Sequence, residues 1–285
     1  MNSVPDAFLD DVCCQLDRSD LYCLKGTCSR WSSLAAIHHS RRRSLKVFLD
    51  VNREGNEVAV GSKELRNGSL DPKYDRISRI QVGCLSMDEP AKTSMECFKK
   101  KVLPILRSLT FDCDFSFTSN KSFHHADLAD STFSGLHDCS QLTRVYITGN
   151  YAGNCAEFIK HQISLGGLKE LYLKGDVDWP ADLQDALRLF VKSPNFEKLD
   201  VFASNLTIDI YMAIAFVERF LYEDLSRMTQ LQGSPSFPLT WLKQLHRNKQ
   251  KLNYTKPRGM IAQWTRSSGG KILAKHGNTL LITSY

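Results

Sequence analysis

The sequence predicts an α/β protein in which a small module of three helices precedes a series of strand and helix units. Two observations lead to this prediction. Between residues 4 and 37, apolar residues recur at the three- and four-residue spacing of helices. Between residues 77 and 201, an apolar pattern that fits a short strand occurs five times, and segments with helical spacing lie between most occurrences.

The three N-terminal helices are predicted from their ends as well as from their spacing. Pro5 suits the first turn of a helix, and Asp6 places negative charge near the free N–H groups of that turn. A second helix fits residues 18–25, because Gly26 suits the left-handed position that often follows a helix. Thr27 can cap a third helix. We assign residues 1–44 to this helical module.

The helical module is rich in apolar residues for its size. Of the 34 residues from Val4 to Ile37, 18 are apolar. So short a unit has no interior that could bury all of them. Part of this surface is therefore expected to face something else, which is either a partner protein or the rest of the same chain.

Residues 3–40 also carry an ordered motif. A Val-Pro start precedes two helices with apolar and leucine positions, and the pattern Cys-x-x-Trp-x-x-Leu closes the motif. This motif resembles an F-box, and its opening resembles the large F-box families of nematodes. The resemblance implies docking on the Skp adaptor of a cullin-RING (SCF) ubiquitin ligase. The residues that it implies for Skp binding are Val4, Pro5, Phe8, Leu9, Val12, Leu16, Leu21, Leu24, Cys28, Trp31 and Leu34.

A hairpin and then a repeated pattern follow the helical module. Residues 45–62 predict the hairpin, because apolar residues alternate on both sides of a turn at residues 53–56. Beyond it, apolar residues spaced as L-x-x-L-x-L begin 29, 36, 26 and 28 residues apart. The five occurrences are Ile77/Ile80/Val82, Leu106/Leu109/Phe111, Leu142/Val145/Ile147, Leu168/Leu171/Leu173 and Phe196/Leu199/Val201.

Four segments between and after these occurrences predict helices. Thr93 and Glu96 form a capping box before a helix that Pro104 is expected to end. The other predicted helices cover residues 155–163, 180–194 and 208–228.

The alternation of strands and helices over residues 45–230 resembles an irregular leucine-rich-repeat array. The resemblance implies a strand/helix solenoid whose open sheet face binds a target protein. The alternative is a plain α/β domain with a few parallel strands. Because strand side chains alternate between faces, the residues between the apolar positions are expected on the open face. Those assigned to target binding are Thr110, Asp112, Arg144, Tyr146, Thr148, Glu170, Tyr172, Lys174, Asp200 and Phe202.

Positive charge is concentrated at the end of the chain. Residues 225–285 contain ten Lys and Arg residues and no acid, whereas residues 1–224 have a net charge of −4. Such a segment can contact phosphates or an acidic protein face. We assign residues 231–285 to a basic segment docked on the repeat domain, because no nucleic-acid motif accompanies the charge. Nucleic acid stays open as a partner. Trp241, Tyr254 and Trp264 are the aromatic residues that such a surface could expose.

No catalytic motif is present, so we assign no catalytic residue, metal or cofactor. No apolar run approaches the ~20 residues of a membrane helix, and no secretory signal opens the chain. We therefore expect a cytoplasmic or nuclear protein with no membrane partner. The predicted function is a non-catalytic SCF adaptor that joins Skp, and through it cullin, to an unknown target. The alternative is a repeat protein that binds partners and has no ligase role.

Overall fold

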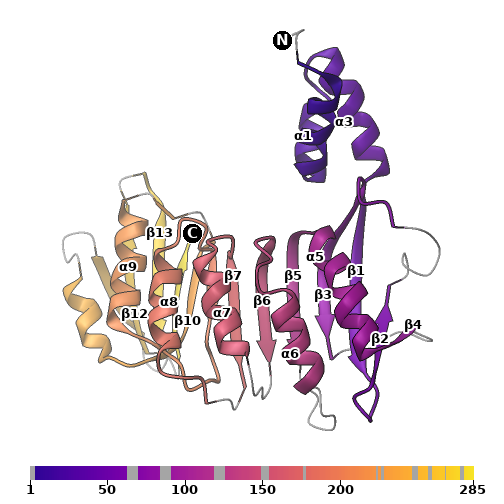
Figure 1. Ribbon diagram of the computed structural model, residues 1–285. Coiled ribbons are helices and arrows are strands. Elements are labelled where there is room, and N and C mark those ends of the chain that lie inside the picture. Colours follow the sequence, from indigo (N-terminus) through magenta and orange to yellow (C-terminus); the bar gives the residue numbers. More distant parts are fainter. Residues whose placement is uncertain are drawn as a thin grey trace.

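The fold consists of an N-terminal bundle of helices and one large mixed sheet that carries helices on one face (Figure 1). This arrangement is seen in a computed structural model of the chain. The structure describes residues 4–62, 70–83, 91–118, 126–148, 154–175, 178–222, 224–225, 228–245, 250–255, 259–266, 268–276 and 279–285.

The predicted three-helix unit is confirmed. It consists of α1 (Asp6–Gln15), α2 (Arg18–Leu24) and α3 (Ser29–Arg41), which we call the N-terminal module. At its centre the buried residues Cys13, Leu21 and Ala35 form a cluster separate from the core of the sheet, and the half-buried residues Leu16, Leu24, Trp31 and Leu34 pack against it. In Figure 1 the module stands away from the sheet at one end of it.

The predicted hairpin is also confirmed, and it begins the sheet. β1 (Arg43–Val51) pairs antiparallel with β2 (Glu57–Gly61), and Val51 lies opposite Val58. β4 (Ala91–Ser94) continues this edge beside β2. On its other side, β1 pairs in parallel with β3 (Asp75–Val82).

The centre of the sheet is parallel, and its strands follow one another in chain order. From β3 onward the neighbours are β5 (Thr110–Thr118), β6 (Leu142–Thr148), β7 (Glu170–Lys174), β8 (Lys198–Asp200) and β10 (Gln230–Pro235). The short strand β9 (Thr207–Ile208) pairs with β10 beside this path. Among the described residues the sheet has fourteen strands.

Helices connect these strands, and Figure 1 shows them on the same face of the sheet. They are α4 (Met95–Cys97), a π-type turn (Phe98–Val102), α5 (Leu103–Leu109), α6 (Ala126–Gly135), α7 (Cys155–Ser164), α8 (Leu183–Lys192) and α9 (Ile210–Leu221). Alternate strand residues are buried beneath these helices, including Phe115, which packs edge-on against Phe133 and Phe158. The other residues of each strand lie on a face that no described helix covers.

The second predicted repeat is wrong in its register. Leu106 and Leu109 lie on helix α5, and the strand begins only at Thr110. A pair of leucines three residues apart fits a helix as well as a strand pattern. The alternation of Cys113, Phe115 and Phe117 is what fixes the strand, because these three side chains are buried.

Two further expectations about helices are corrected. Pro104 does not end a helix but lies in the first turn of α5, because the preceding π-type turn accommodates a residue without an N–H group. The cap of α4 is Ser94, whose Oγ accepts a hydrogen bond from the N–H of Cys97 at 3.2 Å. The last helix, predicted over residues 208–228, ends at Leu221.

The C-terminal part of the chain adds strands to the same sheet. β14 (Leu280–Ser284) pairs with β10, and antiparallel neighbours continue outward through β13 (Lys271–His276), β12 (Gly259–Thr265) and β11 (Gln250–Thr255). A 3₁₀ helix covers Leu239–Gln244. Trp264 is fully buried rather than exposed, and its Nε1–H donates to the carbonyl of Leu245 at 3.0 Å. The side chain of Tyr254 lies outside the described residues.

No helix in the described part of the chain combines the length and the apolar character that crossing a membrane requires.

Candidate functional site

The face of the sheet opposite the helices carries two rows of polar and aromatic side chains. The first, which we call the charged row, crosses five parallel strands and consists of Arg79, Asp114, Arg144, Glu170 and Lys198. The second, which we call the tyrosine row, lies one pleat farther along and consists of Gln81, Ser116, Tyr146, Tyr172 and Asp200. Each row follows from strand register, because directly paired residues project on the same side.

The charged row alternates in sign from strand to strand. Arg79 Nη2 lies 2.9 Å from Asp114 Oδ2, and Arg144 Nη1 lies 2.7 Å from Asp114 Oδ1. Arg144 Nε also lies 3.4 Å from Glu170 Oε1. Opposite charges on neighbouring strands hold one another in place, so the long side chains of this row are fixed relative to the sheet.

The tyrosine row contains a stacked pair. The rings of Tyr146 and Tyr172 lie 4.3 Å apart at 23°. Both hydroxyls donate to Glu170 Oε2, at 3.3 Å and 2.8 Å respectively. Burial and the charge of Glu170 raise the pKa of Tyr146 to about 12 and also raise the pKa of Tyr172. Lys198 Nζ lies 4.8 Å from the centre of the Tyr172 ring.

Six residues predicted for target binding are brought together on this open face. They are Arg144, Tyr146, Thr148, Glu170, Tyr172 and Lys174, all half-buried on β6 or β7. Asp200 lies on the same face but is almost fully buried, and Lys174 Nζ covers it at 3.0 Å. Phe202 is exposed just beyond the end of β8.

The structure corrects the two predicted residues of β5. Thr110 is buried at the start of the strand, where its hydroxyl donates to the carbonyl of Leu106 at 2.6 Å. Asp112 has a left-handed backbone (φ 41°) and accepts a hydrogen bond from the Thr143 hydroxyl at 2.8 Å. The residue that occupies the charged row is Asp114. The alternating segment Asp112–Phe117 was the signal that could have identified it.

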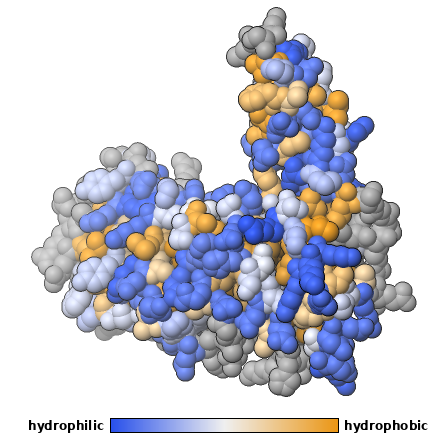
Figure 2. Space-filling model, in the orientation of Figure 1, coloured by the Kyte–Doolittle hydropathy of each residue, from blue (hydrophilic) through white to orange (hydrophobic). Residues whose placement is uncertain are grey.

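The N-terminal module presents the second candidate surface. Figure 2 shows hydrophobic residues gathered on it. Phe8 is 55% exposed, and Tyr22 and Ile37 are also exposed. Of the residues assigned to Skp binding, Pro5 and Cys28 are exposed as well, and those that are half-buried are Val4, Val12, Leu16, Leu24, Trp31 and Leu34.

Two residues assigned to Skp binding have a different position. Leu9 and Leu21 are buried in this structure, with no more than 2% of their surface exposed. They support the exposed residues of α1 and α2 and do not themselves form the outer surface. Their burial follows from the packing of the three helices, because a short bundle turns one stripe of each helix inward.

Polar contacts join the module to the sheet. Arg42 Nη2 donates to the carbonyl of Cys13 at 2.7 Å, and Arg76 Nη2 donates to that of Cys14 at 2.5 Å. Lys73 Nζ lies 2.8 Å from Asp10 Oδ2. The apolar surface around Phe8 takes no part in these contacts.

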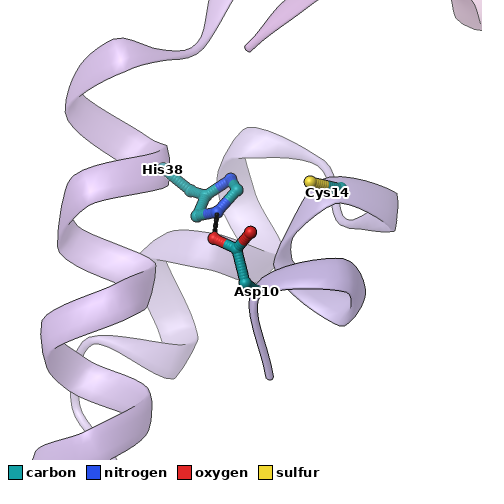
Figure 3. Close-up of side chains that lie close together, drawn as sticks. All are labelled: Asp10, Cys14 and His38. Atoms are coloured by element: carbon teal, nitrogen blue, oxygen red, sulfur yellow. Dashed lines mark hydrogen bonds and ion pairs between the residues drawn. The ribbon is translucent and has the colours of Figure 1, made fainter. Parts of the chain in front are cut away.

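In the part of the chain that the structure describes, two clusters of side chains have the chemistry of metal ligands. One joins Asp10, Cys14 and His38 inside the N-terminal module (Figure 3). In the other, Asp138 Oδ1 lies 3.1 Å from His137 Nδ1 and 3.3 Å from His161 Nε2. The two imidazole rings of the second cluster stack at 3.8 Å, so a single ion cannot lie in the plane of both.

The chain matches no protein-family model, and no curated protein matches it significantly. The functional argument therefore depends on the two surfaces themselves.

Proposed function

We propose that this protein is a substrate-recognition adaptor of an SCF-type ubiquitin ligase. In this proposal the N-terminal module is an F-box that binds Skp, and Skp connects it to cullin. The observation that carries the proposal is the module's unfinished packing. Its separate buried cluster has three residues, with four half-buried apolar residues packed against it, while Phe8 and Ile37 remain exposed.

The position of the module supports a partner other than the chain's own sheet. If the module covered the first strands, Val4, Phe8 and Leu16 would be buried against residues 45–60. Phe8 is instead exposed, and the other two are half-buried. The contacts to the sheet come from arginine and lysine side chains and from the ring of His38, which lies 5.2 Å from the ring of Tyr74. They leave the apolar surface around Phe8 available for a partner.

The open face of the sheet is the proposed site for the target protein. It combines fixed charges with two stacked tyrosines, and tyrosine and arginine are the residues enriched at the centres of protein interfaces. We further propose that residues 45–230 form an irregular leucine-rich-repeat-like unit, because the parallel strands follow chain order and helices cover one face. The protein would position its target, and the conjugating enzyme would supply the chemistry.

A binding measurement with purified Skp tests the proposal. The wild-type chain should bind Skp, and Phe8→Ala should weaken the affinity by about tenfold, because full burial of a phenylalanine is worth about 1.5–3 kcal/mol. Since Phe8 is exposed, its replacement should leave the fold intact.

The matched control is Leu189→Ala. Leu189 is exposed on α8, and it should not affect Skp binding. Absence of binding by the wild type, or undiminished binding by Phe8→Ala, would overturn the adaptor role.

The alternative is a protein-interaction domain with no ligase role. The observation that favours it is that the ion pairs of the charged row and the stacked pair of the tyrosine row form between residues of the sheet, with no contribution from the N-terminal module. Under this alternative, a target would bind the open face while Skp binds neither the wild type nor the variants.

A further inference from the structure

A small cavity lined by arginines lies at the junction between the N-terminal module and the sheet. Its volume is about 160 Å³, and we call it the junction pocket. Pockets for drug-sized molecules measure about 300–1,000 Å³, so this one suits a small ion or a single chemical group. Four arginines and two aspartates line it, an excess of two positive charges: Arg18, Arg42, Arg43, Arg76, Asp17 and Asp112. We propose that the junction pocket binds one oxyanion of the phosphate class.

Arg42 is the central observation, because it is buried and only neutral groups accept its hydrogen bonds. It is 8% exposed. Its Nη2 donates to the carbonyl of Cys13 at 2.7 Å, and its Nη1 lies 3.4 Å from the carbonyl oxygen of Cys14. Its Nε is buried and has no hydrogen-bond partner among the described residues. A buried charge is costly unless an opposite charge accompanies it.

Arg76 brings a second guanidinium to the same place. Its Nη2 donates to the carbonyl of Cys14 at 2.5 Å, the carbonyl that Arg42 also approaches. Burial and the like charge of Arg76 lower the pKa of Arg42. Burial lowers the pKa of Arg76 as well, although the charges of Asp71 and Asp75 oppose this. Two guanidinium groups that share one carbonyl repel each other, and a bound anion would offset that repulsion.

The two aspartates of the lining already have donors of their own. Asp17 Oδ1 accepts a hydrogen bond from the N–H of Asp20 at 2.7 Å. Asp112 Oδ1 accepts one from the Thr143 hydroxyl at 2.8 Å, and Lys169 Nζ lies 3.7 Å from the same oxygen. Lys169 also lowers the pKa of Asp17 through its charge, after the larger effect of the Asp20 hydrogen bond. The positive charge of Lys169 therefore offsets part of the negative charge of both carboxylates.

The arginines match the geometry of a phosphate group. A guanidinium presents a planar fork of N–H donors that fits two oxygens of a phosphate. Arg18 begins α2 and is exposed, whereas Arg76 belongs to β3. An oxyanion in the junction pocket would contact the module through Arg18 and the sheet through Arg76. It would therefore hold the two parts of the molecule in one relative orientation.

Calorimetric titration of the purified full chain with inorganic phosphate, at constant ionic strength, tests the site. We expect one phosphate per chain, competition by sulfate, and no binding of chloride. Arg42→Gln should weaken the affinity for phosphate by at least about tenfold, because it removes a buried charged donor. Arg18→Gln should weaken it by about twofold to fivefold, as expected for an exposed ion pair. Asp112→Asn should strengthen it, because it removes a negative charge from the lining.

The variants at exposed positions keep the test decisive if Arg42→Gln does not fold. Arg18 is exposed, and asparagine tolerates the left-handed backbone of Asp112, so both of these variants should fold. The matched control is Arg53→Gln, which removes an exposed arginine from the turn between β1 and β2 and should bind phosphate as the wild type does.

Three results would overturn the proposal: no binding of phosphate by the wild type, unchanged affinity in both Arg18→Gln and Asp112→Asn, or an equal loss of affinity in Arg53→Gln. A second titration with O-phosphoserine blocked at both ends identifies the source of the oxyanion. Tighter binding than that of phosphate would indicate a phosphorylated side chain, and weaker binding would indicate the free ion. Because Skp takes no part in either titration, the outcome is independent of the adaptor role.

Discussion

At the scale of single residues, Glu170 joins three side chains of the open face. It accepts hydrogen bonds from the hydroxyls of Tyr146 and Tyr172, and it forms an ion pair with Arg144. These partners lie on β6 and β7. One carboxylate therefore fixes the geometry of the aromatic pair at the centre of the proposed target site.

Removing the charge of Glu170 should make the two tyrosines more acidic. In Glu170→Gln we expect the pKa of Tyr146 to fall from about 12 toward its usual value of ~10, because part of the present increase comes from the negative charge. Ultraviolet titration of tyrosinate, with Tyr146→Phe to assign the signal, measures the change. Glu197→Gln serves as the control, since Glu197 is exposed. An unchanged titration would contradict the role given to Glu170.

The raised pKa of Tyr146 also makes the stability of the folded protein depend on pH. A group whose pKa is higher in the folded state stabilises the protein below its unfolded pKa and loses that effect as the pH rises through its folded pKa. The stabilisation from Tyr146 should therefore decline between about pH 10 and pH 12.

At the scale of elements, Asp209 fixes the start of α9. Its Oδ1 accepts a hydrogen bond from the N–H of Met212 at 2.9 Å, and its Oδ2 lies 2.6 Å from Arg188 Nε on the neighbouring helix α8. Burial opposes its charge, but these hydrogen bonds outweigh burial and lower the pKa of Asp209. The residue thus caps one helix and links it to another.

Replacing this cap should destabilise the protein in a pH-dependent way. Asp209→Ala should lower the free energy of unfolding at neutral pH by about 1–2 kcal/mol. Because the folded pKa is lowered, the stabilisation from the charge is present above the usual aspartate pKa of ~3.9 and is lost as the pH falls through the folded value. Urea unfolding of both proteins at neutral and acidic pH measures this; an equal difference at every pH would contradict the charge effect.

The same scale shows what could be predicted from the sequence. Helical spacing of apolar residues predicts α7 and α8, and alternation of apolar residues predicts β6 and β7. The same patterns do not predict α6 and start β5 too early, because short apolar pairs fit both kinds of element. The antiparallel strands after β10 show simple alternation, such as that of Leu280 and Ile282, and not the L-x-x-L-x-L spacing that predicts the parallel strands.

The sequence predicts the open face of the sheet better than the surface of the N-terminal module. The residues of β6 and β7 follow directly from alternation, so the open face was found there. Asp114 was missed with the register of β5. The burial of Leu9 and Leu21 depends on how three helices pack together, which spacing within one helix does not determine. The Asp10–Cys14–His38 cluster likewise requires that packing.

At the scale of the whole molecule, two apolar cores remain separate. The core of the N-terminal module contains Cys13, Leu21 and Ala35, whereas the sheet and its helices share one large continuous core. Polar contacts and the ring contact of His38 with Tyr74 connect the two parts. The sheet should therefore fold without the module.

A deletion tests this separation. The chain from Arg43 to Tyr285 should remain folded, with a Tm lowered by no more than the roughly 2–4 °C that 1 kcal/mol produces in a domain of this size. Calorimetry of the full chain and the truncated chain measures the difference. Aggregation or loss of the cooperative transition in the truncated chain would show that the module supports the sheet.

The junction between the two parts has a geometric consequence. α3 ends at Arg41 and β1 begins at Arg43, so a single buried residue separates helix from strand. Because the linker is one residue long, the rotation of α3 about its axis sets the orientation of α1 and α2 relative to the sheet. Adding one residue to α3 would swing a protein held at Phe8 by about 100° relative to the tyrosine pair.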